Sequence, residues 1–111
     1  MMPGTARLVE VCNEHYGSSS NNEGAVELWY RWLNEGYPVY ATVGTDIHGP
    51  ADPTLEFAFN VVYAQEFSEA AILEGVRHGH CYLSSGPRLD FAGQSSSGAA
   101  MMGDSLTGNR F

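Results

Sequence analysis

The chain has 111 residues, enough for one small domain, and 43% of them are hydrophobic, so a buried core is expected. Thirteen acidic residues against five basic ones give a net charge of −8, which argues against nucleic acids and anionic membranes as partners and is compatible with divalent cations. No apolar run reaches the roughly 20 residues of a membrane span, and no signal peptide is visible, so we expect a soluble chain. The sequence does not indicate its cellular compartment. Cys12 and Cys81 each lie in an apolar run, which predicts buried free thiols.

The first half of the chain has the pattern of a strand, a helix and a second strand. Residues 7–13 are largely apolar, and residues 39–43 are rich in β-branched and aromatic side chains. Between them, residues 22–34 carry apolar side chains at helical spacing: Ala25, Leu28, Trp29, Trp32 and Leu33. Asn21 or Asn22 is the expected N-cap. Short links in such a βαβ unit predict parallel strands and a right-handed crossover.

The second half repeats this alternation less clearly. Its composition predicts, in order, a loop at 49–54, a strand at 57–64, a helix capped by Ser68 and ended by residues 77–79, and strands at 80–84 and 88–91. Residues 93–100 are Gly, Gln, Ser and Ala, which predicts a flexible link, and residues 101–107 are expected to add a short turn or edge strand. We therefore divide the chain into a partial α/β domain at 1–92 and a Gly/Ser-rich link with a short tail at 93–111.

Two residues of metal-ligand type follow the strand at 39–43. Gly44 allows the chain to leave the sheet, after which Asp46 offers a carboxylate and His48 an imidazole. In extended chain their Cα atoms would be roughly 6.5–7 Å apart on one side. This spacing suits one ligand for each of two neighbouring metals, which lie about 3.5–4 Å apart in hydrolytic clusters. The alternative is a turn-forming Asp beside an exposed His.

Further candidate ligands lie near the end of the first strand. Glu10 is either an inward carboxylate near a polar centre or a charge at the strand edge, Asn13 ends the strand, and His15 lies in the loop after it, where it is either a ligand or merely exposed. A catalytic zinc needs about three protein ligands, so a site with Asp46 and His48 alone needs completion by another chain or by a longer protein. A separate structural zinc would take its ligands from Cys12, His15, His78, His80 and Cys81. Residues 84–87 are expected to form a bend and not a serine nucleophile.

Taken together, several segments resemble the PHP (polymerase and histidinol phosphatase) superfamily of metal-dependent phosphoesterases, in its CehA/McbA-like branch. The match runs in order over roughly residues 7–107. The similar segments are Val9–Asn13 (I-E-V-x-N), Trp29–Gly36 (W-x-x-L-L-x-x-G), Val43–His48 (G-[ST]-D-x-H), Glu69–Pro87 (A-I-x-x-G-x-x-Y-x-S-x-G-P) and the trailing Gly103–Leu106.

This resemblance implies α/β architecture, with βαβ units forming the C-terminal part of a distorted (β/α)7 barrel and a short β-rich tail. It further implies two or three divalent ions (Zn, Mn or Fe), with Asp46 on one and His48 on another, and water that attacks a phosphate-ester substrate. The family's early H-x-H, its middle histidines and its bridging carboxylate have no counterpart here, and His80 stands where a basic residue is commoner. The chain alone is therefore expected to be inactive and need not bind metal. The alternative is a non-catalytic α/β module that binds a partner or forms a homo-oligomer.

Overall fold

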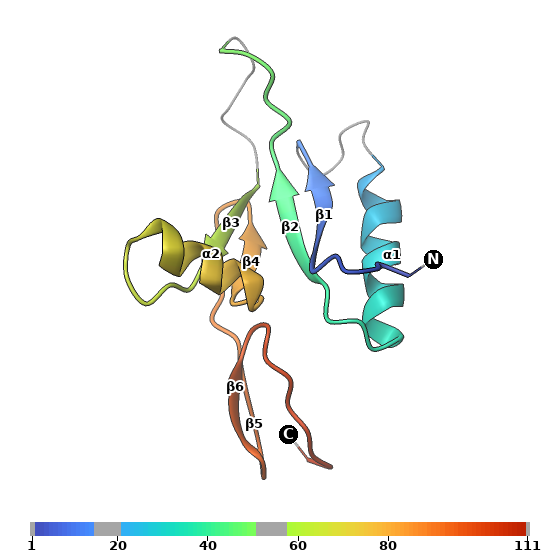
Figure 1. Ribbon diagram of the computed structural model, residues 1–111, viewed down its shortest axis with the longest axis vertical. Helices are drawn as coiled ribbons and strands as arrows, with labels where there is room; N and C mark the ends of the chain where they lie inside the picture. Colours follow the sequence, from blue (N-terminus) through green and yellow to red (C-terminus); the bar gives the residue numbers. More distant parts are fainter. Residues whose placement is uncertain (1, 15–20, 51–57, 111) are drawn as a thin grey trace.

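The computed structural model describes residues 2–14, 21–50 and 58–110, which form a mixed α/β fold (Figure 1). The elements, in order, are β1 (Leu8–Asn13), α1 (Asn22–Asn34), β2 (Tyr40–Gly44), β3 (Phe59–Val62), α2 (Glu69–Arg77), β4 (Cys81–Ser84), β5 (Ala92–Ser95) and β6 (Gly98–Met101). The strands pair as three two-stranded sheets, β1-β2, β3-β4 and β5-β6. Within the described ranges the sheets do not close into a barrel. The predicted strand at 57–64 is found as β3, and residues 51–57 lie outside the described part.

The predicted βαβ unit is confirmed. β1 and β2 are parallel, in register from Leu8 opposite Tyr40, with an irregularity between Glu10 and Cys12. Asn21 caps α1, accepting a hydrogen bond from the Gly24 amide at 3.2 Å. α1 packs on β1, and the buried apolar side chains of the described residues gather in this unit: Val11, Cys12, Trp32, Val39 and Val43.

The second half of the fold departs from the predicted βαβ pattern. β3 and β4 are antiparallel, with Val62 opposite Cys81, and the Tyr63 amide donates to the His80 carbonyl at 2.8 Å. This hydrogen bond joins the residue after β3 to the residue before β4. The segment that contains α2 therefore connects the two strands of an antiparallel hairpin and is not a crossover between parallel strands. The helix itself is as predicted: the Ser68 hydroxyl caps it, accepting from the Ala71 amide at 3.2 Å.

The C-terminal part also differs from prediction. Residues 88–91 have no regular structure, whereas the predicted flexible link at 93–100 is largely an antiparallel hairpin, β5-β6. Hydroxyl groups hold this hairpin: Ser95 and Ser97 each donate from Oγ to the Thr107 carbonyl at 2.8 Å. The bend predicted at 84–87 is present, with the Ser84 hydroxyl donating to the Pro87 carbonyl and accepting from the Gly86 amide.

Both cysteines are free thiols, as predicted; the predicted burial holds for Cys12, whereas Cys81 is only half-buried. Burial raises the pKa of each thiol, and the charge of Glu10 adds to the effect at Cys12. Neither helix of the described ranges has the length and apolar character to cross a membrane.

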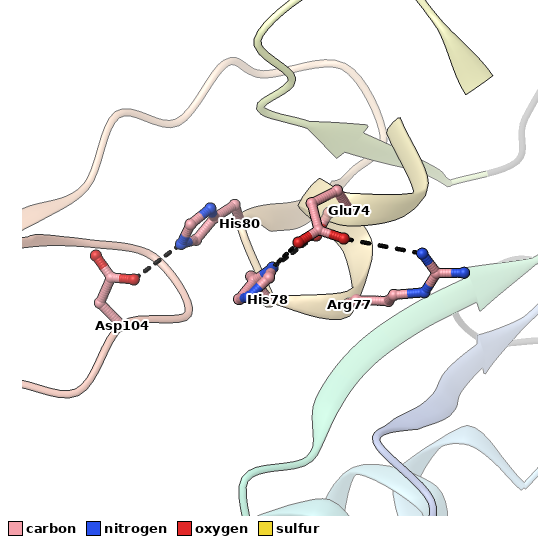
Figure 2. Close-up of polar contacts among 5 residues, drawn as sticks. All are labelled: Glu74, Arg77, His78, His80 and Asp104. Carbon is pink, nitrogen blue, oxygen red and sulfur yellow. Dashed lines mark hydrogen bonds and ion pairs between the residues drawn. The ribbon is translucent and has the colours of Figure 1, made fainter. Parts of the chain in front are cut away.

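A close backbone approach joins the turn after β6 to the turn after α2. A Cβ on Gly103 would overlap the backbone of His78 and Gly79, and Gly103 has a left-handed φ of 89°. Beside this contact His80 Nε2 lies 2.8 Å from Asp104 Oδ1, as Figure 2 shows. Asp104 Oδ2 also accepts from the Met101 amide at 3.0 Å. This junction therefore holds the C-terminal hairpin to the rest of the fold.

We expect this junction to loosen at acidic pH. The Met101 amide and then the His80 ring hold the pKa of Asp104 below its ordinary value of 3.8. A carboxylate whose pKa is lowered in the folded state contributes to the stability of the fold at pH above about 4. That contribution is lost as the pH falls through the pKa of the folded state. Amide signals of Met101 and His80, followed by NMR from pH 5 to pH 2, should therefore shift together. Asp104→Asn should abolish the transition and Asp90→Asn should leave it; a transition that persists in Asp104→Asn would contradict this assignment.

Candidate functional site

The candidate site lies at the edge where β1 and β2 both end, because parallel strands bring their carboxyl ends together (Figure 1). The last hydrogen bond of the pair runs from the Glu14 amide to the Gly44 carbonyl, at 2.9 Å. Beyond Gly44 the chain leaves the sheet and projects past the strand ends (Figure 1). Asp46 and His48 lie on this projecting segment, with side chains 46% and 79% exposed.

Asp46 and His48 are brought together by a local turn. The His48 Nδ1 atom lies 2.5 Å from the Asp46 backbone oxygen. A carbonyl oxygen only accepts, so Nδ1 carries the ring proton and the lone pair of the neutral ring is on Nε2. Nε2 lies 3.7 Å from Asp46 Oδ1. Donation of the second ring N–H to a backbone carbonyl is the usual arrangement of a metal-ligating histidine.

The predicted division of these residues between two metals rests on an extended backbone, which the structure does not have. Asp46 adopts a left-handed φ of 54°, so the chain turns between the two side chains. Metal–nitrogen and metal–oxygen distances at zinc are about 2.0–2.2 Å. Two donor atoms 3.7 Å apart can therefore contact one ion at the same time. The geometry fits one shared ion better than one ion for each residue.

Backbone strain gathers at this edge. Among the described residues, the non-glycine positions with a left-handed backbone are Glu14, at φ 60°, and Asp46, at φ 54°. Each such position costs of order 1–3 kcal/mol and is commonest at functional sites. Their occurrence at the ends of two paired strands supports a functional role for this edge.

Glu10 and Asn13 lie near the same edge but bond to each other. Asn13 Nδ2 donates to Glu10 Oε1 at 2.9 Å, and the Glu10 carboxylate covers Gly44 so closely that a Cβ there would overlap it. The backbone amide of Asn13 donates to the side chain of Asn22 at 2.9 Å. These contacts place Glu10 at the strand ends, whereas the predicted role of Glu10 and Asn13 as ligands stays a prediction. His15 lies outside the described residues.

In the parts of the chain that the structure describes, no group of three or more His, Cys, Asp and Glu side chains is arranged to hold a metal. The described candidates for a structural zinc therefore do not converge. The raised thiol pKa values of Cys12 and Cys81 also disfavour the thiolate form that binds zinc. The fit to a divalent ion rests on the donor pair of Asp46 and His48.

Asn60 is a residue of this edge that the sequence motifs do not predict. From β3 its side chain accepts from the Val43 amide at 3.0 Å and donates to the Val43 carbonyl at 2.9 Å. The Asn60 side chain thus makes the two hydrogen bonds that the backbone of a neighbouring strand would otherwise make to Val43, the residue before Gly44. The one available signal is its polar side chain within the apolar run 57–64.

Loss of the Asn60 side chain is expected to destabilise the protein. Asn60→Ala removes both bonds to Val43, and at about 0.5–1.5 kcal/mol for each bond the expected loss in the free energy of unfolding is about 1–3 kcal/mol. Urea denaturation measures it. Asn34→Ala, at the exposed end of α1, is the control and should change stability by less than about 0.5 kcal/mol. Equal stability of Asn60→Ala and the unmodified chain would show that the two bonds contribute nothing.

Comparisons with protein-family models, with curated proteins and with solved structures give no match for this chain.

Proposed function

We propose that this chain is the C-terminal segment of a PHP-type metal-dependent phosphoesterase, to which it contributes Asp46 and His48 as metal ligands. The observation that carries the proposal is the 3.7 Å approach of Asp46 Oδ1 to the His48 nitrogen that bears the lone pair. The order of sequence motifs, from the strand at 9–13 to the segment ending at Pro87, supports the same family.

The roles of the chain's own residues follow from this geometry. Asp46 supplies a carboxylate oxygen. The hydrogen bond from His48 Nδ1 to the Asp46 carbonyl orients the imidazole so that its Nε2 atom lies near that carboxylate oxygen. Asn60 braces the strand that leads into the loop. A divalent ion, when bound, supplies Lewis acidity toward a phosphate ester. With two ligands where a catalytic site needs about three, the chain by itself is expected to bind metal weakly and to be inactive or nearly so.

The proposal is tested by metal content and by hydrolysis of a chromogenic phosphate ester, in the unmodified chain and in Asp46→Ala and His48→Ala. Any metal-dependent hydrolysis should fall in both variants, and the metal held at this loop should be lost. Asp90→Ala is the control, because Asp90 is an exposed carboxylate that pairs with Arg88 at 3.5 Å, outside this loop. Hydrolysis that is unaffected by both site variants would overturn the proposal.

A second candidate function is self-association as a non-catalytic module, and the surface of the chain favours it. The solvent-accessible area is 8169 Å², against roughly 6,000 Å² for a compact monomer of 12.0 kDa. The radius of gyration is 15.5 Å, against about 13 Å for a compact domain of this length. Exposed apolar side chains include Leu8, Phe59, Leu89 and Phe91.

The solvent-accessible area of the chain thus exceeds that of a compact monomer by roughly 2,000 Å², which is more than the ~800 Å² that each partner buries in a standard interface. We therefore expect dimers or larger forms when the molar mass is measured by light scattering after size exclusion. A monomer at every concentration up to about a hundred micromolar would argue against a self-associating module.

A further inference from the structure

The β5-β6 hairpin lies apart from the other two sheets, at one end of the molecule (Figure 1). β5 and β6 pair with each other, and neither packs extensively on another described helix or strand. A two-stranded hairpin on its own is at best marginally stable in water, and further strands or a covered face stabilise it. The tail covers one face, since Ser95 bonds to the Thr107 carbonyl and a Cβ on Gly93 would meet Leu106 Cδ2 at 3.1 Å.

The register of the hairpin determines which backbone groups lie at the outer edge of β5. Met101 pairs with Ala92, but the Met101 amide donates to the Asp104 carboxylate and its carbonyl accepts from the Asp104 amide. The Ala92–Met101 pair is therefore not hydrogen-bonded. Bonded and unbonded pairs alternate along an antiparallel ladder, so the Gln94–Ala99 pair, two residues on, is not hydrogen-bonded either. Ala92 and Gln94 thus direct their N–H and C=O groups away from β6. Both residues are exposed, and no described strand pairs with them on that side.

The edges of β1, β2 and β6 are protected against another strand by side chains. On β1 the Asn22 side chain bonds to the backbone amide and carbonyl of Asn13, at 2.9 and 3.3 Å. On β2 the Asn60 side chain does the same at Val43. On β6 the Asp104 carboxylate places a negative charge at the edge. Blocked or charged edges are a common means by which proteins avoid edge-to-edge pairing, whereas β5 contains no charged residue.

The charge distribution favours contact between two copies at this hairpin. The chain has a net charge of −8, so two copies repel each other. Residues 91–103, which contain the hairpin, form the longest stretch of the chain without a charged residue, so the repulsion is weakest there. Apolar area is available beside the strand, because Phe91, directly before β5, is 67% exposed and Leu89 is 48% exposed.

We propose that two copies of this chain associate through the outer edges of their β5 strands, which pair antiparallel about a two-fold axis at Gly93. The strands then form one sheet in the order β6, β5, the partner's β5 and the partner's β6. Ala92 of one copy exchanges two hydrogen bonds with the partner's Gln94, and the axis repeats this pair. Phe91 comes to lie beside the partner's strand, which removes apolar area from water. This inference rests on the proposed self-association, for which it names the interface.

The experiment measures the dimer dissociation constant of the full chain by sedimentation equilibrium. Gln94→Pro removes an amide donor from the proposed interface, and it should raise the constant at least about tenfold, because a symmetric dimer loses two hydrogen bonds. Ala99→Pro is the matched control: Ala99 pairs with Gln94 but directs its amide to the edge of β6, so the constant should be nearly unchanged. Each proline removes an N–H that the hairpin itself does not use, which is the position where a strand tolerates proline.

Amide hydrogen exchange of the unmodified chain is the second measurement and needs no substitution. As the concentration is raised, exchange at Ala92 and Gln94 should slow, while exchange at Ala99 is unchanged. A dimer that Gln94→Pro leaves intact, an equal loss in Gln94→Pro and Ala99→Pro, or dimerisation without protection of Ala92 and Gln94 would overturn this interface and leave self-association standing. A chain that stays monomeric at every concentration would overturn self-association and this interface with it.

Discussion

Replacing Trp32 with alanine is expected to cost about 3–5 kcal/mol in the free energy of unfolding, the usual loss when a large aromatic side chain is removed from a core. Trp32 is 7% exposed and belongs to α1, the helix that packs against β1. Few large side chains share this core, since the other buried apolar residues in the described ranges are Val11, Cys12, Val39 and Val43. The total free energy of unfolding of a small domain is only about 5–15 kcal/mol, so this loss would be a large part of it.

Urea denaturation followed by circular dichroism measures this loss. Tyr30→Ala is a matched control on the same helix: Tyr30 is 56% exposed and stacks on Trp29, a contact expected to contribute less than about 1.5 kcal/mol. Equal midpoints for the two variants would contradict the placement of the core between α1 and β1.

Replacing Gly103 with alanine is expected to release the C-terminal hairpin, at a cost of about 2–4 kcal/mol from the left-handed backbone and the steric overlap. The new Cβ would overlap the backbone of His78 and Gly79. Neither side can yield easily, because Gly79 is itself buried, has a φ of 69° and lies against the ring of Tyr40. The bond between His80 and Asp104 would be lost with the contact.

Amide hydrogen exchange in β5 and β6 reports this release, and we expect faster exchange there while α1 is unaffected. Gly98→Ala is the control within the same hairpin: it also has positive φ, at 133°, but a Cβ there meets no atom within 4 Å. If the two variants exchange alike, strain at a positive φ accounts for the effect and the close approach to Gly79 does not.

The parts of the fold that follow from local pattern were predictable from the sequence. The helical spacing around Trp32 and the caps at Asn21 and Ser68 predict α1 and α2, because capping and amphipathic periodicity act over a few residues. The parallel pairing of β1 with β2 follows from the short links around α1.

Long-range contacts set the parts that were not predicted. The antiparallel pairing of β3 with β4 depends on closure between Tyr63 and His80, which no composition reveals. The hairpin at residues 92–101 looks like a flexible link because its Ser and Gly residues lack apolar alternation, yet Ser95 and Ser97 bond to Thr107 ten or more positions away.

For the candidate site, the sequence offers candidate residues but does not indicate their geometry. The strand, glycine and ligand order identifies Asp46 and His48, and the structure brings their donor atoms to 3.7 Å. Their relative position depends on the left-handed backbone of Asp46, a conformation that a carboxylate side chain tolerates but that spacing alone does not indicate. Asn60 reaches the edge through tertiary contacts with Val43, so a local motif cannot reveal it.

The most direct test of the central claim is a Zn²⁺ titration of the full chain that follows the imidazole signals of His48 by NMR. NMR reports on each histidine separately, so the response of His48 can be distinguished from that of the others. We predict a saturable shift of these signals, with a dissociation constant raised at least tenfold in Asp46→Ala and unchanged in Asp90→Ala. The tenfold factor is expected because Asp46 supplies one of the two protein ligands to the ion. His48 signals that do not move up to millimolar Zn²⁺, or that move equally in Asp46→Ala, would contradict a metal shared by these two residues.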